Sequence, residues 1–173
     1  EGSAEQQRFI LKALASEDFA FLEGPPGSGK TETIGELILQ LLSDTEHNYR
    51  ILLCGSTQAS IDNVLSRFGE NELVQPLRIV NSRRWRNEPL QRDQLVYDSD
   101  IHRWTEPEQV DDLKQRLGSA AADLSDEDLS EMVLRRSNLV CATIGGVPQH
   151  PLIKEALRDE HVPPKALFDV LII

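Results

Sequence analysis

Short apolar runs punctuate this chain, and amphipathic segments separate the first of them. The runs are continuous rather than alternating, which is typical of parallel strands that are covered on both faces. They lie at residues 19–23 (FAFLE), 50–55 (RILLCG), 77–80 (LRIV), 138–143 (NLVCAT) and 168–173 (FDVLII). The pattern therefore predicts a parallel sheet built from these five segments.

The amphipathic segments have the spacing of helices. Apolar residues recur on one face in residues 4–16 and again in residues 30–44. A further helix is predicted through residues 58–68, with Ser56 or Thr57 as its N-cap. Helices that separate successive strands indicate crossover units, so the predicted fold class is α/β, with a parallel sheet flanked by helices in one domain.

Residues 85–136 differ from the rest because they are polar and acidic and contain two predicted helices. Thr105 with Glu108, and Ser125 with Asp128, have the spacing of capping boxes at the starts of these helices. We interpret residues 85–136 as a helical insertion in the sheet topology. Two ordinary crossover helices are the alternative that the sequence leaves open.

Composition adds limits to this picture. The chain has 173 residues and a formal net charge of −11, which argues against a nonspecific polyanion binder but allows a local nucleic-acid groove. No apolar run approaches the ~20 residues needed to cross a bilayer, so no membrane partner is expected. Cys54 and Cys141 each lie in an apolar run, where buried free thiols are expected; this favours a reducing compartment, cytoplasmic or nuclear.

The residues GPPGSGKT match the pattern G-x-x-x-x-G-K-[ST] of a phosphate-binding loop. Glycines let the backbone turn its N–H groups toward a triphosphate, and the next helix directs its N-terminal dipole at the same charge. Lys30 is expected to contact the β- and γ-phosphates of ATP, and Thr31 to offer its hydroxyl to Mg²⁺. The alternative is a glycine and proline turn with a chance lysine, but the predicted flanking strand and helix favour nucleotide binding. The candidate loop residues are Gly24, Pro25, Pro26, Gly27, Ser28, Gly29, Lys30 and Thr31.

Taken with its neighbours, this loop resembles that of superfamily 1 helicases, in particular the Upf1-like group. GPPGSGKTET is similar to that group's GPPGTGKT loop, with Ser28 in the usual Thr position. EQQRFILKAL resembles the Q motif, in which a glutamine contacts the edge of adenine, and Gln7 fits that pattern better than Gln6. A solvated helix glutamine is the alternative for Gln7.

Three later segments extend the resemblance to the nucleic-acid side. ILLCGSTQASIDNVLSRF resembles motif Ia, which implies that Ser56, Thr57 and Gln58 contact the nucleic-acid backbone, although Ser-Thr-Gln replaces the usual Pro-Ser-Asn. Helix capping is the alternative role for these residues. NLVCATIGG resembles the family's later strand that ends in Cys-x-Thr, which implies that Thr143 faces nucleic acid. In LRIVNSRRWR, Arg83 is the candidate backbone contact, with a solvated surface arginine as the alternative.

The run FDVLII resembles the Walker B strand, which in the family continues directly into Asp-Glu. This ending, with Glu1 at the start, suggests an excerpt from a longer polypeptide. The resemblance implies that residues 1–173 are a partial first RecA-like domain that stops just before motif II. It also implies single-stranded nucleic acid, DNA or RNA, and a second RecA-like domain of the same polypeptide as partners.

The implied function is the ATP-binding part of an ATP-dependent helicase or translocase. Residues 1–173 alone are expected to lack hydrolysis, because the Asp-Glu pair is absent from them. A small P-loop kinase and a nucleotide-responsive interaction domain are the two alternatives.

Overall fold

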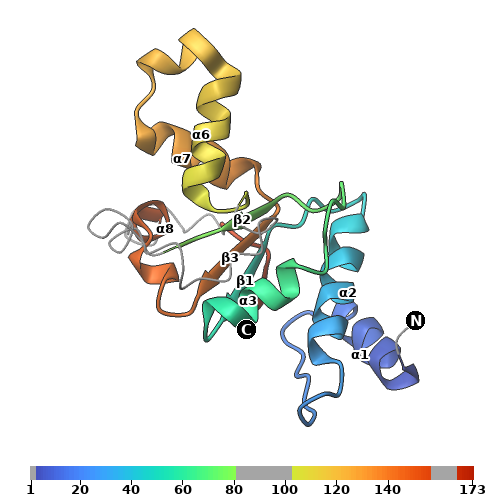
Figure 1. Cartoon of the computed structure of the whole chain (residues 1–173). Coiled ribbons are helices and arrows are strands. Elements are labelled where there is room, and N and C mark those ends of the chain that lie inside the picture. Colours follow the sequence, from blue (N-terminus) through green and yellow to red (C-terminus); the bar gives the residue numbers. More distant parts are fainter. Residues whose placement is uncertain (1–2, 81–102, 157–166) are drawn as a thin grey trace.

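A four-stranded parallel sheet forms the centre of the molecule (Figure 1). The computed structural model describes residues 3–80, 103–156 and 167–173. The strands are β1 (Ile51–Gly55), β2 (Pro76–Arg78), β3 (Leu139–Thr143) and β4 (Val170–Ile172), in the order β2-β3-β1-β4. The parallel α/β fold predicted from the continuous apolar runs is thereby confirmed.

The two central strands set the register of the candidate site. β1 and β3 pair from Ile51 opposite Leu139 to Gly55 opposite Thr143. β4 lies on the other side of β1, with Val170 opposite Ile51. Because all these strands are parallel, their carboxyl ends open at one edge of the sheet, which is where α/β folds bind ligands.

One face of the sheet is covered by helices that come early in the chain: α1 (Ala4–Leu14), α2 (Lys30–Ser43) and α3 (Gln58–Leu65). α2 and α3 pack on the sheet, whereas α1 packs on α2 (Figure 1). Burying a Leu or Ile side chain stabilises a fold by about 1.5–3 kcal/mol. This layer therefore holds α2 against the sheet. Its core includes Ile38, Leu41, Ile51, Leu53, Ile61, Val64, Leu65, Leu139 and Cys141.

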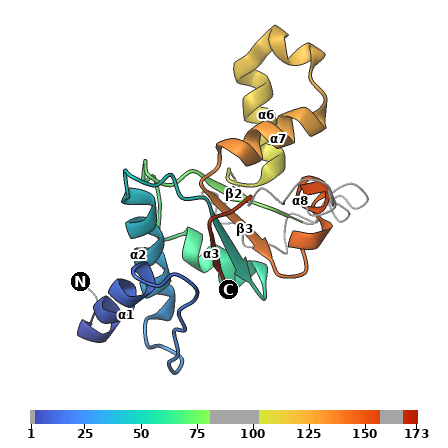
Figure 2. The same ribbon diagram turned by 180° about the vertical axis from the view of Figure 1, so that it is seen from behind.

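The other face is covered by later elements. These are α6 (Glu106–Leu117), the 3-10 helix η1 (Gly118–Asp123), α7 (Asp126–Arg136), the 3-10 helix η2 (Val147–Gln149) and α8 (Pro151–Ala156). α6 and α7 pack against each other as a helical pair. One end of the pair, its base, lies on the sheet, and the other end projects away from the sheet in both views (Figures 1 and 2). The second core joins Leu52, Leu77, Val140 and Ala142 of the sheet to Val110, Leu113, Leu129, Val133, Leu134 and Ile153.

The expectation of a buried strand at residues 19–23 is wrong. The segment has no strand geometry, and Phe19 and Phe21 are 73% and 85% exposed. A strand is stabilised by its ladder partners, and this segment pairs with none of the described strands. The two phenyl rings instead lie against each other, with centroids 5.3 Å apart.

The predicted N-terminal capping contacts agree with the structure for α7 and α3 but not for α6. Ser125 and Asp128 form the predicted reciprocal capping box at the start of α7. Thr57, rather than Ser56, caps α3, in a box with Ser60. Thr105 is the N-cap residue of α6 but its side chain makes no capping bond, so that capping-box prediction is wrong. Thr105 is fully buried, and its backbone forms a bridge with Arg78 of β2.

The helical segment between β2 and β3 is seen from residue 103 onward, and residues 85–102 of the predicted insertion lie outside the described residues. The boundaries 85–136 stay a prediction. Within the described part, α6 and α7 pack on each other and α6 contacts β2. None of the helices described is both long and apolar enough to span a membrane.

Candidate nucleotide site and strand-end turns

The loop at residues 24–31 needs glycine at three positions for two different reasons. Gly27 and Gly29 have φ values of 80° and 77°, a left-handed region that L side chains rarely adopt. A Cβ on Gly24 would lie 2.6 Å from the Ser28 hydroxyl oxygen and 3.3 Å from its Cβ, so a side chain at this position would displace Ser28. The loop thus has the bare, tightly turned backbone that the sequence pattern predicts for phosphate binding.

Lys30 begins α2 and directs its ammonium group back into the loop. Its Nζ donates to the carbonyl oxygens of Gly24, at 2.5 Å, and Pro25, at 2.9 Å. The cation therefore lies among backbone groups at the N-terminus of a helix, where helix and ammonium charges both favour an anion. Thr31 is half-buried in the same first turn, while Pro26 and Ser28 are exposed.

The glutamine that contacts this loop is Gln6. Its Nε2 donates to the carbonyl oxygens of Ser28, at 3.3 Å, and Gly29, at 3.5 Å. Its Oε1 accepts from the Ser3 backbone N–H at 2.6 Å, which completes the cap of α1. Gln7, at the next position of the helix, is exposed. The assignment of Gln7 to adenine stays a prediction.

The turn after β1 is a compact strand-to-helix connection. Thr57 accepts from the Ser60 N–H at 3.1 Å, and the Ser60 hydroxyl donates back to the Thr57 carbonyl at 2.7 Å. Gly55 is required by close packing, since a Cβ there would lie 2.5 Å from Ser60 Oγ. Ser56 and Thr57 are exposed at this turn, and Gln58 is half-buried. The capping role of Thr57 is therefore real, and its side chain remains at the surface.

The turn after β3 lies beside it. Gly55 and Thr143 are register partners, and the Ile144 N–H donates to the Gly55 carbonyl at 3.0 Å. Thr143 is half-buried at the carboxyl end of its strand. The structure thus brings together Ser56, Thr57, Gln58 and Thr143, as the order of parallel strands requires. Arg83, the remaining candidate, lies outside the described residues.

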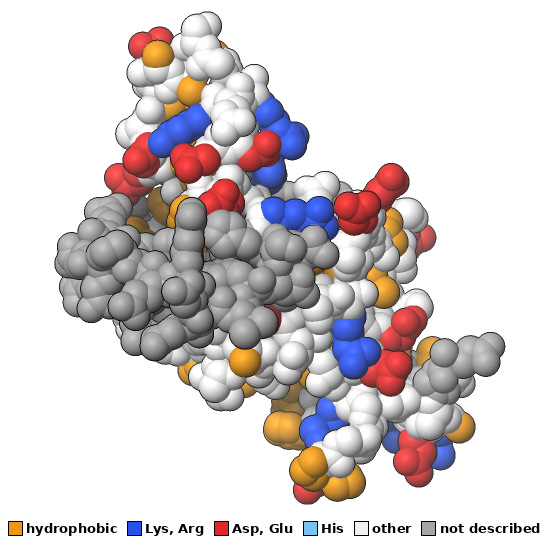
Figure 3. All heavy atoms as spheres, viewed as in Figure 1, with side chains coloured by type: hydrophobic (Ala, Val, Ile, Leu, Met, Phe, Trp, Pro, Cys, Tyr) orange, Lys and Arg blue, Asp and Glu red, His pale blue; other side chains and the backbone are white. Residues whose placement is uncertain are grey.

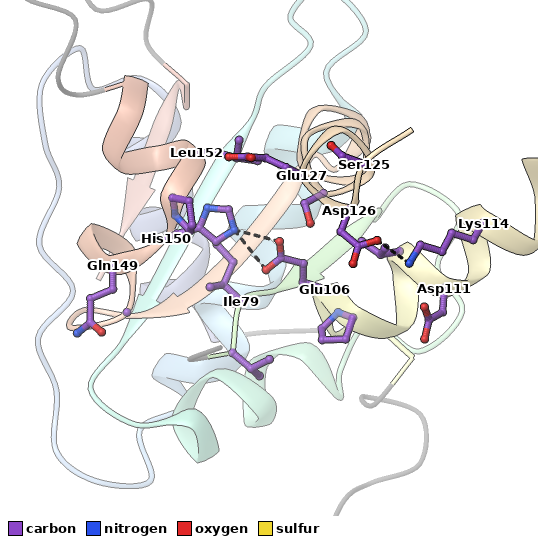
Figure 4. Close-up of a pocket in the computed structure, with 16 residues that line it drawn as sticks. Ile79, Glu106, Asp111, Lys114, Ser125, Asp126, Glu127, Gln149, His150 and Leu152 are labelled. Carbon is purple, nitrogen blue, oxygen red and sulfur yellow. Dashed lines mark hydrogen bonds and ion pairs between the residues drawn. The ribbon is translucent and has the colours of Figure 1, made fainter. Parts of the chain in front are cut away.

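Two charged pairs near these turns were not predicted from the sequence. Arg78 of β2 donates to both carboxylate oxygens of Asp62 on α3, at 2.6 Å and 2.9 Å. His150 places Nε2 3.2 Å from both carboxylate oxygens of Glu106 at the start of α6 (Figure 4). The only sequence signal for the first pair is a charged residue inside an apolar strand, which is rarely left unpaired.

The two cysteines are buried free thiols, as the sequence predicts. Burial raises the pKa of the Cys54 thiol and raises that of the Cys141 thiol much further. Neither thiol is therefore a nucleophile at neutral pH. Among the described residues, no group of three or more His, Cys, Asp or Glu side chains is arranged to hold a metal ion.

Charges on the described surface are mixed. On the face shown in Figure 3, Lys and Arg side chains are interspersed with Asp and Glu rather than gathered in one broad field.

The glycine-rich loop at the start of α2 and the parallel sheet beneath it define a P-loop NTPase domain of the RecA-like type. The chain matches the family described as AAA domain over residues 2–122 and belongs to it. Together with the relatives below, this places it in the Upf1-like group of superfamily 1 helicases, as its motifs predict.

Three relatives illustrate the similarity. The chain is 33% identical over 87 residues to DNA polymerase alpha-associated DNA helicase A of Schizosaccharomyces pombe, covering 47% of this chain and 13% of that protein. It is 35% identical over 99 residues to helicase sen1 of the same yeast, covering 44% and 6%. It is 32% identical over 79 residues to putative ATP-dependent RNA helicase ECM32 of Saccharomyces cerevisiae, covering 45% and 7%. The matches thus span only a small part of each relative.

Proposed function

We propose that this chain is the ATP-binding part of an ATP-dependent helicase or translocase that acts on single-stranded nucleic acid. The observation that carries the proposal is the position of Lys30. Its ammonium group lies inside a glycine-rich loop at the start of α2, and α2 is packed on the same sheet that carries Thr57 and Thr143 at its strand ends. A phosphate-binding site and a polynucleotide-facing edge would thus share one rigid sheet.

ATP would take the place that the lysine now partly occupies. The β- and γ-phosphate oxygens are stronger partners for the ammonium group than the neutral carbonyls of Gly24 and Pro25. Backbone N–H groups of the loop and the first turn of α2 would add donors to the same phosphates. Bound Mg²⁺ would neutralise developing phosphate charge, and Thr31 is the residue of this chain that would hold it.

Nucleic acid would bind across the adjacent turns. Three residues at the carboxyl ends of neighbouring strands carry hydroxyl groups: Ser56 and Thr57, which are exposed, and Thr143, which is half-buried. Hydroxyl and backbone N–H contacts to phosphate oxygens are independent of base sequence, as a translocating enzyme requires. Gln58 and Arg83 complete the proposed set. The relatives' names include both DNA and RNA helicases, so both substrates belong in the test.

The remaining catalytic groups are proposed to follow β4. β4 runs parallel to β1, so the chain after Ile173 would emerge at the edge that carries Gly55 and Thr143. An Asp-Glu pair there would complete the Mg²⁺ site and activate water, and a second RecA-like domain would supply positive charge. Losing a catalytic base costs about 10²–10⁴-fold, and losing an arginine supplied in trans costs about 10³–10⁵-fold.

Residues 1–173 alone should therefore bind ATP with little or no turnover. Phosphate release from this polypeptide, with and without single-stranded nucleic acid, measures this directly. Robust turnover that disappears in Lys30→Ala would mean that a carboxylate within residues 1–173 serves as the base, and that the proposed role of β4 is wrong.

The phosphate-loop assignment is tested in the full-length protein with Lys30→Ala. ATP hydrolysis should fall by about 10²–10³-fold or more, as expected for removal of a preorganised charge-stabilising group. Lys12→Ala is the matched control, because Lys12 is an exposed lysine in the last turn of α1. Hydrolysis by Lys30→Ala at the parent rate would refute the assignment.

The nucleic-acid assignment is tested by the ratio of stimulated to basal ATPase activity. Thr143→Val and Arg83→Glu should lower stimulation by single-stranded DNA or RNA more than they lower basal turnover. Ser125→Ala, which removes a helix cap of α7, is the control for general loss of stability. An ATPase that no DNA or RNA stimulates would favour a P-loop kinase or a nucleotide-responsive interaction domain instead.

A further inference from the structure

The base of α6 is linked to the elements that follow both strand-end turns: to α3 through Arg78 of β2, and to the segment after β3 through Glu106. On one side, Arg78 joins β2 to Asp62 of α3, and its backbone N–H donates to the Trp104 carbonyl at 2.7 Å. Arg78 also forms a bridge with Thr105, the N-cap residue of α6. A single residue thus links α3 to the start of the helical pair α6/α7.

On the other side, Glu106 links the same helix to the segment after β3. It is the first residue of α6, and both of its carboxylate oxygens lie 3.2 Å from Nε2 of His150. His150 directly follows η2, and the turn before η2 is closed by the Gly146 N–H, which donates to the Thr143 carbonyl at 2.8 Å. Figure 4 shows the imidazole and the carboxylate facing each other across the base of the helical pair.

Both contacts are shielded from water. The side chains of Arg78 and His150 are 6% and 5% exposed, and those of Asp62 and Glu106 are 30% and 17% exposed. Hydrogen bonds that involve charged groups are strengthened in such surroundings. An open pocket of about 730 Å³ lies beside the Glu106–His150 contact, lined by α6, α7, η2 and α8 and by Ile79 and Val80 after β2 (Figure 4). Glu106 and His150 both line this pocket, so their contact joins two of its walls.

We propose that Arg78 and Glu106 are positioning residues that join the helical pair α6/α7 to both strand-end turns, so that the three move as one body when nucleic acid binds. The inference rests on the proposed function, because it assigns the turns to nucleic acid. Neither residue needs to touch the polynucleotide. Arg78 acts through Asp62, which lies about one helical turn beyond the N-cap Thr57, and Glu106 acts through His150 and the turn that begins at Thr143.

The test uses Asp62→Asn and Glu106→Gln in the full-length protein. Each change removes a carboxylate charge and keeps the side-chain shape, and neither residue belongs to the proposed phosphate or nucleic-acid contacts. The concentration of single-stranded DNA or RNA that gives half-maximal ATPase stimulation should rise about 10-fold in each variant. Basal ATPase activity should stay within about 2-fold, because the ammonium group of Lys30 is held by carbonyls of its own loop, Gly24 and Pro25.

Lys114→Ala is the matched control. It breaks an ion pair of 2.7 Å between Lys114 and Asp126, which lies within the helical pair and is exposed. This variant should leave the half-maximal concentration unchanged. Unchanged values in both Asp62→Asn and Glu106→Gln would overturn the proposal, and if Asp62→Asn does not fold, Glu106→Gln decides alone.

The double variant Asp62→Asn/Glu106→Gln tests whether the two contacts act together as one junction or independently of each other. If both contacts hold the same rigid body, the nucleic-acid concentration for half-maximal stimulation of the double variant should rise by clearly less than the product of the two single effects. A full product would overturn the claim that the three parts move together, while each contact would remain a local support.

Hydrogen exchange tests the junction without nucleic acid, so its outcome does not depend on the proposed function. In Glu106→Gln without nucleic acid, amides should exchange faster, by about 5-fold or more, both at residues 143–146 and at residues 57–62, while residues 24–31 stay unchanged. Faster exchange confined to α6 and η2 would overturn the proposal. If the parent protein is not stimulated by nucleic acid, the proposed function fails, and this spread of exchange still decides whether the junction exists.

Discussion

The loop at residues 24–31 and the turns after β1 and β3 are held in place by different interactions. The loop depends on left-handed glycine backbone and on a few partly exposed contacts from Lys30 and Gln6. The turns depend on β-ladder register and on a partly buried ion pair between Arg78 and Asp62. The first region can rearrange its partners when a triphosphate arrives, whereas the second cannot move without disturbing the core.

If the proposed function holds, this contrast lets one sheet support both a nucleotide that binds and dissociates in each cycle and a nucleic-acid strand that must be held at fixed geometry. Polar contacts in water are individually weak and are easily exchanged. Contacts made under a layer of buried side chains cost much more to break. Replacing Lys30 or Gln6 at the loop should therefore change nucleotide binding with little effect on stability, whereas replacing Arg78 beneath the turns should lower stability with little effect on nucleotide binding.

The largest expected difference between the two regions is in stability. Arg78→Met should lower the free energy of unfolding by about 3 kcal/mol, because it leaves the partly buried carboxylate of Asp62 without its partner. Lys30→Met should lower it by less than about 1 kcal/mol, since its partners are loop carbonyls that water can reach. Urea unfolding followed by tryptophan fluorescence measures both. Equal losses would break the comparison.

A second prediction separates the two reasons for glycine. Gly55→Ala should cost about 2 kcal/mol by overpacking, since a Cβ there would lie 2.8 Å from Ile61 Cγ1 and 3.2 Å from the Thr57 carbonyl oxygen. Gly27→Ala should cost about 1–2 kcal/mol through its left-handed backbone alone, because no atom lies within 4 Å of the added Cβ.

Asparagine distinguishes the two cases, since it tolerates left-handed backbone better than alanine but is larger. Gly27→Asn should be more stable than Gly27→Ala, and Gly55→Asn should be less stable than Gly55→Ala. The opposite ranking at either glycine, in the same urea unfolding experiment, would show that its role is misassigned.

A smaller effect is expected at the two neighbouring glutamines of α1. Gln6→Ala should weaken the binding of ATP and GTP alike by about 2–10-fold, because Gln6 supports the loop through the Ser28 and Gly29 carbonyls without contacting the base. Gln7→Ala should weaken ATP more than GTP if Gln7 contacts adenine. Titration of both variants with fluorescent ATP and GTP analogues measures these affinities. If Gln6→Ala, rather than Gln7→Ala, lost the preference for ATP over GTP, Gln6 would be the residue that contacts adenine.

The smallest effect is expected at the thiols beneath the turns. Burial raises the pKa of both Cys54 and Cys141, so their thiolates stay scarce as pH rises through the range where an exposed cysteine ionises. Iodoacetamide at pH 8.5 should leave the folded protein almost unlabelled and label both residues after unfolding in urea. Mass spectrometry reads the result, and rapid labelling of the folded protein would show that the sheet opens far more readily than its packing implies.

Local patterns in the sequence determined most of the architecture. Continuous apolar runs predicted β1 through β4 within a few residues, because a strand buried on both faces needs such a run wherever it lies. The capping box at Ser125 and Asp128 and the glycine pattern at residues 24–31 were also predictable, since each depends on neighbours close in the chain.

Only the tertiary structure decided which distant groups meet. The run at residues 19–23 has the composition of a strand, yet it lacks a partner among the described strands and leaves Phe21 at the surface. The pairing of Glu106 with His150, and the contact of Gln6 with the phosphate loop, join residues far apart in the sequence. Such pairs leave no periodic signal, because their geometry is set by the register of β1 and β3 and by the side on which each helix crosses the sheet.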